Sequence, residues 1–183
     1  MAYRITIKKG NLLDAPSSDF IVNPSNTILA LGSGVSGAFA ATCGSALQEE
    51  MNRKRDHSAP LSKGDVVLTG PGGCTQFRHV LHAAVMDYRP DTTETVPSLD
   101  DIRTILTNIE SFLADEAAVS SATVTLTLPL MGTGVGGLDK RHVLEIYRVF
   151  FRREVDFECE VLLYGHSEAD CLLMQRVFGE ERA

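Results

Sequence analysis

The sequence predicts an α/β fold in which helices cover both faces of a mixed, largely parallel sheet. Short apolar segments with the pattern of strands alternate along the chain with segments of helical periodicity. Two glycine-rich turns, Gly32–Gly37 and Gly132–Gly137, each follow an apolar stretch and precede an amphipathic one. With 183 residues, of which 44% are apolar, the chain is long enough to bury one substantial core.

Six segments have the composition of β-strands. Residues 3–8 alternate apolar and polar side chains, and residues 20–22 form a short buried run that leads into a polar turn at 23–26. The other candidates are residues 65–69, 79–85, 123–128 and 159–164. In a sheet of this kind, ligands bind beyond the carboxyl ends of the strands, and both glycine-rich turns are expected there.

Four segments have helical periodicity. One follows each glycine-rich turn, one begins at a capping box formed by Ser98 and Asp101, and one follows the last strand with Ser167 and Asp170 at its start. The second helix has an apolar stripe from Leu99 to Leu113. The side chains expected to face the sheet are Val35, Ala38, Phe39 and Ala46 in the first helix, Val143, Ile146, Tyr147 and Phe150 in the third, and Ala169, Leu172, Leu173 and Val177 in the fourth.

Composition and charge exclude several classes of function. The formal net charge of −7 argues against long-range attraction to DNA, RNA or an anionic membrane. No segment approaches the roughly 20 apolar residues of a membrane span, and the N-terminus lacks an apolar signal segment. We therefore expect a cytoplasmic protein with no membrane partner and no non-specific binding of nucleic acid.

The cysteines and histidines lack the spacing of a metal or redox motif. The cysteines are Cys43, Cys74, Cys159 and Cys171, and we expect them all to be reduced thiols. His79 and His82 are an odd number of residues apart in a predicted strand, so they should lie on opposite faces of the sheet. We therefore expect neither a metal nor a cofactor.

The two glycine-rich turns predict a phosphate site. Glycine lets backbone N–H groups approach an anion closely, and a helix N-terminus adds partial positive charge. Two such turns, far apart in sequence, indicate two walls of one cleft that holds an elongated ligand such as a diphosphate. Glycines also cluster in turns for conformational reasons alone, so a purely structural role without a ligand is the alternative.

Two common phosphate-binding motifs do not fit. A P-loop requires Lys followed by Ser or Thr directly after its last glycine, whereas Leu138 and Asp139 follow Gly137. A Rossmann fingerprint requires a second strand soon after the first helix, and the corresponding segment, residues 53–63, is charged and unlike a strand. The P-loop class is excluded, and the Rossmann class fits poorly.

Several segments together resemble the macro domain family, in the family's order and over essentially the whole chain. They are Gly10–Leu13, Ile21–Asn26, Gly32–Gly37, Gly64–Thr69, the strand that ends at His82, and Pro129–Gly137. The resemblance implies a three-layer α/β/α fold and a single macro-like domain over residues 1–183. It also implies that the partner is ADP-ribose or an ADP-ribosylated substrate, and some macro domains hydrolyse ADP-ribosyl linkages or ADP-ribose esters.

The same resemblance implies which residues bind the ligand. Asn26 matches the second Asn of the family's VNAAN motif, which contacts the distal ribose; the alternative is an Asn that satisfies the backbone of a turn. Asn11, with Leu12, stands where many members carry an Asp that accepts from the adenine amino group. Tyr164 is the candidate for stacking on adenine, and a core aromatic is the alternative. The diphosphate would be held by Gly32, Ser33, Gly34, Val35 and Ser36 in the first turn and by Gly132, Thr133, Gly134, Val135 and Gly136 in the second.

The chain departs from the hydrolytic members at two positions. One hydrolytic branch carries an Asp where this chain has Ser36, and another carries an Asp where it has Gly136. A serine hydroxyl is no general base near neutral pH without a partner. No catalytic residue is therefore identified beyond Asn26 as a candidate, and two interpretations stay open. One is a binding module for ADP-ribose or a related NAD metabolite; the other is a hydrolase in which the substrate diphosphate, His142 or Asp139 orients water.

Overall fold

A computed structural model describes residues 1–32, 34–120 and 122–179. The predicted alternation of strands and helices is confirmed, with six strands and four helices in these ranges. The strands are β1 (Tyr3–Lys9), β2 (Ser18–Asn26), β3 (Val66–Thr69), β4 (Phe77–Met86), β5 (Val124–Pro129) and β6 (Cys159–Gly165). The helices are α1 (Gly34–Asp56), α2 (Leu99–Val119), α3 (Lys140–Phe151) and α4 (Glu168–Gly179), and a 3-10 turn, η1, covers Leu12–Asp14.

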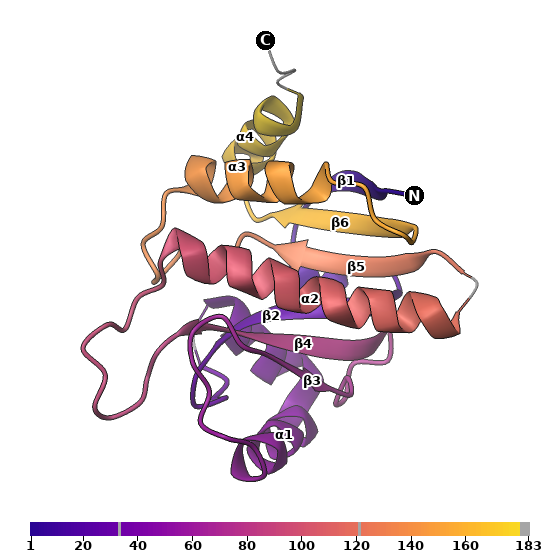
Figure 1. The fold of residues 1–183 in the computed structure, drawn as a ribbon. Coiled ribbons are helices and arrows are strands. Elements are labelled where there is room, and N and C mark those ends of the chain that lie inside the picture. The colour runs from indigo at the N-terminus through magenta and orange to yellow at the C-terminus, as the bar shows by residue number, and fades with distance from the viewer. Residues whose placement is uncertain (33, 121, 180–183) are drawn as a thin grey trace.

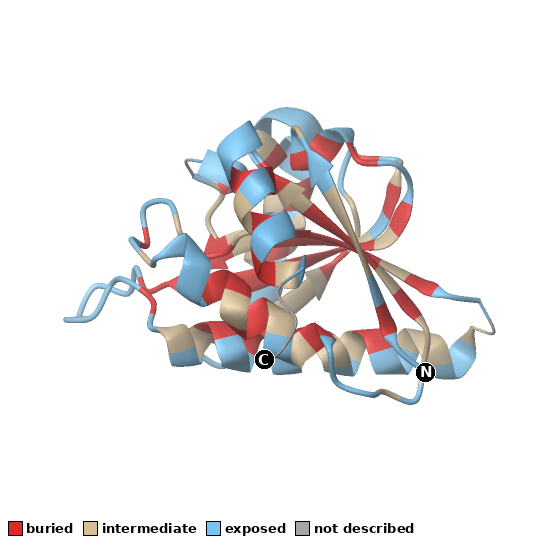
Figure 2. Cartoon of the chain, turned by 90° about the horizontal axis from the view of Figure 1, so that it is seen from above, coloured by how far each residue is buried: buried red, intermediate tan, exposed pale blue. Residues whose placement is uncertain are grey.

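The strands form one mixed, largely parallel sheet in the order β1-β6-β5-β2-β4-β3. Every pairing is parallel except that of β3 with β4. Helices α2 and α3 lie across one face, α1 lies on the other, and α4 packs beside β1, β6 and α3 (Figure 1). The expected three-layer α/β/α architecture is therefore confirmed, and buried residues concentrate on the strands and on the helix faces that meet them (Figure 2).

Strand β2 is longer than the sequence predicts. The polar segment 23–26, expected to be a turn, continues the strand, and Pro24 pairs with Ala83 of β4. Pro24 has no N–H to donate, but the pairing of β2 with β5 covers only Phe20 and Ile21, so Pro24 lies where β2 is paired on one side. The register shifts between Ser25 and Asn26, where the strand leaves the sheet.

The buried face of α1 differs from the predicted one. Val35 and Ala46 are exposed, and Ala38 is only partly buried. The residues that pack inward are Ser36, Phe39, Cys43, Leu47 and Met51. Gly44 has the non-helical angles φ 72° and ψ −172°, so α1 consists of two helical segments around a kink, and a single helical stripe could not describe both.

The buried face of α4 is also rotated relative to the prediction. Val177 is buried as expected, and Leu173 is partly buried. Ala169 and Leu172 are exposed, however, and Cys171 and Met174 take their places against the sheet. The stripes predicted for α2 and α3 are confirmed, because both helices carry longer runs of large apolar side chains.

The prediction of four reduced thiols is wrong for two of the cysteines. Cys43 of α1 and Cys74 of the loop between β3 and β4 form a disulfide, with their Cα atoms 4.8 Å apart. The Gly73 amide also donates to the Cys43 carbonyl at 2.7 Å, so the loop lies directly against the helix. Since 31 residues separate the two cysteines, their spacing in the sequence carried no sign of the pair. Cys159 and Cys171 are free and buried.

Among the described residues, no helix combines the length and the apolar character needed to cross a bilayer.

Candidate functional site

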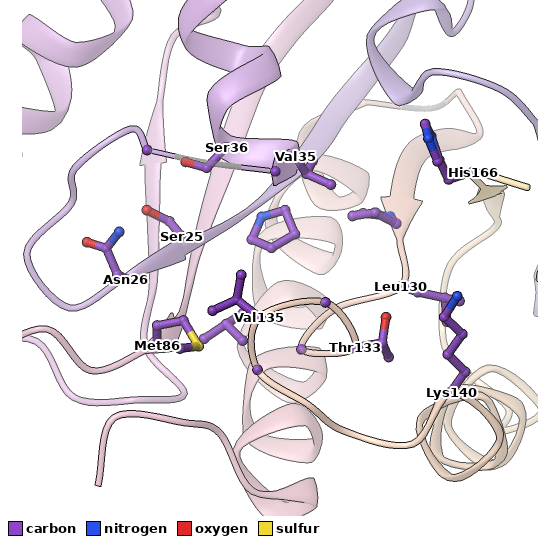
Figure 3. A pocket seen from close by; sticks show the side chains of 18 of the residues that line it. Ser25, Asn26, Val35, Ser36, Met86, Leu130, Thr133, Val135, Lys140 and His166 are labelled. Atoms are coloured by element: carbon purple, nitrogen blue, oxygen red, sulfur yellow. The ribbon is translucent and has the colours of Figure 1, made fainter. Parts of the chain in front are cut away.

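A cavity of about 440 Å³ opens at the carboxyl edge of the sheet. The segment that follows β2 and the segment that follows β5 form two of its walls (Figure 3). Its lining includes Pro24, Ser25, Asn26, Gly32, Gly34, Val35, Ser36, Met86, Tyr88, Pro129, Leu130, Gly132, Thr133, Gly134, Val135, Gly136, Lys140, Tyr164, His166 and Asp170. Because β5 is the neighbour of β2 in the sheet, two glycine-rich segments about 100 positions apart meet around one space.

The first glycine-rich segment, which we call loop 1 (Gly32–Gly37), leads directly into α1. A Cβ atom on Gly37 would lie 2.5 Å from the Gly32 carbonyl oxygen, so the turn closes too tightly for a side chain there. The amides of the first helical turn have no acceptor within the helix, and they carry its partial positive charge. Loop 1 therefore offers the pocket an anion-binding helix N-terminus. Ser33, predicted to belong to it, lies outside the described residues.

The second segment, loop 2 (Gly132–Gly137), closes in the same manner. A Cβ on Gly136 would lie 2.6 Å from the Gly132 carbonyl oxygen, which also accepts from the Leu138 amide at 3.0 Å. The amides from Thr133 to Gly136 donate to no other atom in the ranges that the structure describes. Unlike loop 1, it does not open a helix directly, because α3 starts at Lys140 with Asp139 as its N-cap.

One end of the pocket is neutral and polar, with Ser25, Asn26 and Ser36 on the same side (Figure 3). The Asn26 side chain accepts from the Ala30 amide at 3.1 Å and donates to the Ala30 carbonyl at 2.9 Å, so it braces its own turn. The hydroxyls of Ser25 and Ser36 are buried and have no hydrogen-bond partner among the described residues. A buried hydroxyl without a partner is uncommon, and a bound ligand or water would satisfy both.

The other end is charged. Lys140 donates to Asp170 at 2.6 Å, and His166 lies on the same side of the pocket as Lys140 (Figure 3). Burial alone would raise the pKa of Asp170, but hydrogen bonds from Lys140 and Ser167 outweigh it and hold that pKa below its usual value. Tyr164, at the end of β6, is partly buried and also lines the pocket. Desolvation raises the pKa of its phenol.

Sequence reasoning missed Tyr88, Lys140, His166 and Asp170 as pocket residues. Asp170 was recognised only as a helix-capping residue, which it also is, since its carboxylate accepts from the Ser167 amide at 3.2 Å. The sequence did carry one signal for Lys140 and His166. Each follows closely on a segment already assigned to the pocket edge, namely loop 2 and the end of β6.

Four other candidates lie away from the pocket lining. Asn11 accepts from the Leu13 amide at 3.0 Å and caps η1, and Leu12 is buried in the core beneath α1. Gly10, just before them, donates to the carbonyl of Gly165, the last residue of β6, which places them beside the end of the strand that carries Tyr164. Asp139 and His142 are exposed at the start of α3, and neither lines the pocket.

No cluster of three or more His, Cys, Asp or Glu side chains in the described ranges is arranged to hold a metal ion.

Fold and pocket together define an α/β protein with a cavity between two glycine-rich loops at the carboxyl edge of its sheet. A model of the macro domain matches residues 22–147, and the chain belongs to this family.

Two curated relatives are similar in sequence. An uncharacterized protein of Aeropyrum pernix is 32% identical over 126 residues, which cover 69% of this chain and only 59% of that protein. A macro domain-containing protein of Caldanaerobacter subterraneus subsp. tengcongensis is 32% identical over 138 residues, which cover 75% of this chain and 73% of that protein.

Two solved structures are similar in fold. A mutant of the Oceanobacillus iheyensis macrodomain with ADPR superimposes with a TM-score of 0.78 at 19% identity, over 96% of this chain and 91% of that one. The Trypanosoma brucei macrodomain in complex with ADP-ribose gives a TM-score of 0.69 at 22% identity, over 94% of this chain and 68% of that one. At these identities the likeness is one of fold.

Proposed function

We propose that this protein binds ADP-ribose, or an ADP-ribosyl group on a larger molecule, in the pocket between loop 1 and loop 2. The observation that carries the proposal is that these two remote loops line one cavity, with free amides in loop 2 and a helix N-terminus in loop 1. Such groups hold a diphosphate without a cationic side chain. The macro domain family, and the ADP-ribose-bound macrodomains with this fold, support the same ligand.

The two ends of the pocket fit the two ends of this ligand. Tyr164 lies at the charged end and provides a ring on which adenine can stack. Ser25, Asn26 and Ser36 lie at the neutral end, where the hydroxyls of Ser25 and Ser36 suit the vicinal hydroxyls of a terminal ribose. The Asn26 amide bonds to Ala30 through one N–H and one lone pair, so its second N–H and second lone pair serve the ribose in this proposal. Asn11 is kept in the proposal only as a neighbour of the adenine end, because its side-chain oxygen already accepts from Leu13.

We further propose that residues 1–183 form a single macro-like domain. The family match spans residues 22–147, but β1, β6 and α4 lie outside this span and belong to the same structure. Strand β6 pairs with β5 along its length, and β1 pairs with β6, so neither terminal segment is a separate unit.

Binding is favoured over hydrolysis because the neutral end of the pocket lacks a general base. Among the described lining residues the only carboxylate is Asp170, which is paired with Lys140 at the opposite end. Ser36 and Gly136 stand where hydrolytic members carry the carboxylate, and the Asn26 amide cannot accept a proton near neutral pH. Hydrolysis of an ADP-ribosyl linkage or ester is the alternative that the experiment below decides.

Isothermal titration calorimetry and thermal melting with ADP-ribose, ADP and AMP test the proposal. We expect saturable binding with one site per chain, and a stabilisation of about 2.7 kcal/mol when ADP-ribose is present at 100 times its Kd. AMP should bind more weakly, because it lacks the second phosphate and the terminal ribose. No heat and no melting shift with ADP-ribose would refute binding and favour a purely structural role for the glycines.

Incubation with a mono-ADP-ribosylated protein, O-acetyl-ADP-ribose and ADP-ribose 1″-phosphate tests the alternative. Release of ADP-ribose from any of them at a rate above the uncatalysed one would overturn the view that the protein only binds.

A further inference from the structure

Two tyrosines line the pocket from strands that are not neighbours. Tyr164 is the sixth residue of β6, and Tyr88 follows two residues after the end of β4. Strands β5 and β2 lie between β6 and β4, so three strand spacings, about 14 Å, separate the two positions along the edge of the sheet. The two glycine-rich loops follow the intervening strands, so the tyrosines stand on either side of the proposed diphosphate site.

Tyr88 belongs to the neutral end of the pocket. The neighbouring Met86 pairs in register with Asn26, and the Thr27 amide donates to the Met86 carbonyl at 2.9 Å. The Tyr88 amide in turn donates to the Thr27 hydroxyl at 3.0 Å. Tyr88 is therefore tied to the segment that supplies Asn26, although 44% of it is exposed.

A buried carboxylate fixes the backbone on either side of Tyr88. The Asp87 carboxylate accepts from the Thr27 hydroxyl at 2.9 Å, from the Arg89 amide and guanidinium at 2.6 to 3.2 Å, and from the Thr92 hydroxyl at 3.0 Å. The Asp87 amide donates to the Thr95 carbonyl at 2.9 Å. The Asp87 side chain is only 3% exposed, whereas the Arg89 side chain is 43% exposed.

This arrangement fixes the backbone at an exposed aromatic residue that lines the pocket. The Asp87 network orders the backbone on both sides of Tyr88, so a ring that contacts the ligand avoids part of the entropic cost of being ordered on binding. The neutral end also lacks any other aromatic residue among the described residues that line the pocket.

We propose that Tyr88 is a specificity-determining residue: its ring packs against the terminal ribose, and the Asp87 cluster positions it. This inference rests on the proposed binding of ADP-ribose and adds to it a residue that distinguishes ADP-ribose from ADP. The loop between β4 and α2 thus contacts the sugar end of the ligand, while Tyr164 contacts the base end.

The test compares ADP-ribose with ADP, which lacks only the terminal ribose. Calorimetry on the full chain should show that Tyr88→Ala weakens the affinity for ADP-ribose about three- to tenfold and changes the affinity for ADP by less than twofold. Tyr88→Phe should keep the wild-type affinity for both ligands. Tyr164→Ala is the matched control, because loss of a ring at the base end should weaken the two ligands equally.

The positioning role of Asp87 has its own readout. Asp87→Asn should weaken the binding of ADP-ribose but not the binding of ADP. If this variant does not fold, the milder Thr92→Val takes its place. The same change made in the Tyr88→Ala background should cause no further loss, because its effect acts through the ring. If Asp87 had a merely structural role, the change would weaken the binding of both ligands, or its effect would add to that of Tyr88→Ala.

Three outcomes separate the two proposals. Absence of ADP-ribose binding by the unaltered protein would overturn the proposed function, and this inference with it. Binding that Tyr88→Ala leaves unchanged, or weakens equally for ADP-ribose and ADP, would overturn this inference alone. A loss confined to ADP-ribose supports it.

Discussion

Loop 1 and loop 2 close over different lengths of chain, a separation of five residues between Gly32 and Gly37 and of four residues between Gly132 and Gly136. In each loop a late glycine, Gly37 or Gly136, passes so close to an earlier carbonyl that a Cβ would lie 2.5 or 2.6 Å from it. Loop 1 includes the first turn of α1, which starts at Gly34. In loop 2 the four amides from Thr133 to Gly136 donate to no other described residue, and α3 starts only at Lys140. One wall of the pocket therefore carries a helix N-terminus and the other a peptide turn, and both backbone features suit an anion.

The two loops also differ in how they are anchored. The disulfide between Cys43 and Cys74 ties the first segment of α1, and so loop 1, to the loop between β3 and β4. Loop 2 contains no cysteine and so has no such cross-link. Of the two central glycines, Gly34 has a φ of +62°, whereas Gly134 has an ordinary φ and open space around its Cα. Position 34 is therefore constrained by its backbone, whereas position 134 has room for a Cβ atom.

The largest expected effect concerns the anchor of loop 1. Replacing Cys43 and Cys74 together by Ser should lower the free energy of unfolding by roughly 3–4 kcal/mol, because the cross-link closes a loop of about 30 residues in the unfolded chain. Urea unfolding of the purified variant measures this. Cys171→Ser is the matched control, a buried free cysteine whose loss should cost less. Equal stability with and without the pair would contradict the anchoring.

The next effect separates ligand blocking from misfolding. Gly134→Leu should weaken ADP-ribose binding at least about 100-fold, or about 2.7 kcal/mol, with little change in melting temperature, because position 134 lines the pocket and a Cβ there meets no atom within 4 Å. Gly34→Leu should weaken binding and also lower stability, because its backbone is in the left-handed region. Gly179→Leu, at an open site far along the chain, is the control and should leave affinity unchanged.

A smaller effect tests whether the loops close alike. Gly37→Ala and Gly136→Ala should each lower the free energy of unfolding by about 1–3 kcal/mol, since a methyl group would be forced against a backbone carbonyl. Chemical denaturation of the two variants makes the comparison. If one were neutral and the other strongly destabilising, the two turns would not share the geometry described above.

The smallest effect concerns pH. The pKa of Asp170 is held below its usual value in the folded protein, so this carboxyl contributes stability that is present above its unfolded pKa and is lost as the pH falls through its folded pKa. Asp170→Asn should therefore flatten the loss of stability between neutral and acidic pH, by less than about 1 kcal/mol given the exposure of Lys140. Melting curves across this range check it. An unchanged pH profile would mean that the ion pair does not stabilise the fold.

Much of the fold could be predicted from the sequence, because a long apolar pattern in a strand or helix shows which of its faces is buried. The stripe of α2 and its capping box at Ser98 are both present. The buried faces predicted for α1 and α4 were wrong for local reasons. Gly44 breaks α1 into two segments. In α4 the nearby aliphatic residues Ala169 and Leu172 favoured one face, but the helix buries Cys171 and Met174 instead. A pattern over one helix cannot show such shifts.

The pocket was predicted from the glycines of loop 1 and loop 2 and, through the resemblance to the macro domain family, at Asn26 and Tyr164, which also line the cavity. Loop 1 and loop 2 were identified from their composition, and the sheet order then brings them together. Tyr88 could not be identified, because nothing in a single sequence shows which side chains beyond a strand end face the same cavity. The one signal for Lys140 and His166 was that they closely follow loop 2 and the end of β6. The pair of Cys43 and Cys74 was hidden for the same reason, since only the packing of α1 against a remote loop brings the two together.

A crystal structure of the protein with ADP-ribose tests the central claim most directly. We predict that phosphate oxygens lie within hydrogen-bond distance of amides from both walls, at Gly34–Ser36 in loop 1 and at Thr133–Gly136 in loop 2. A diphosphate held by one loop alone, or a ligand bound outside the cavity between them, would contradict the account.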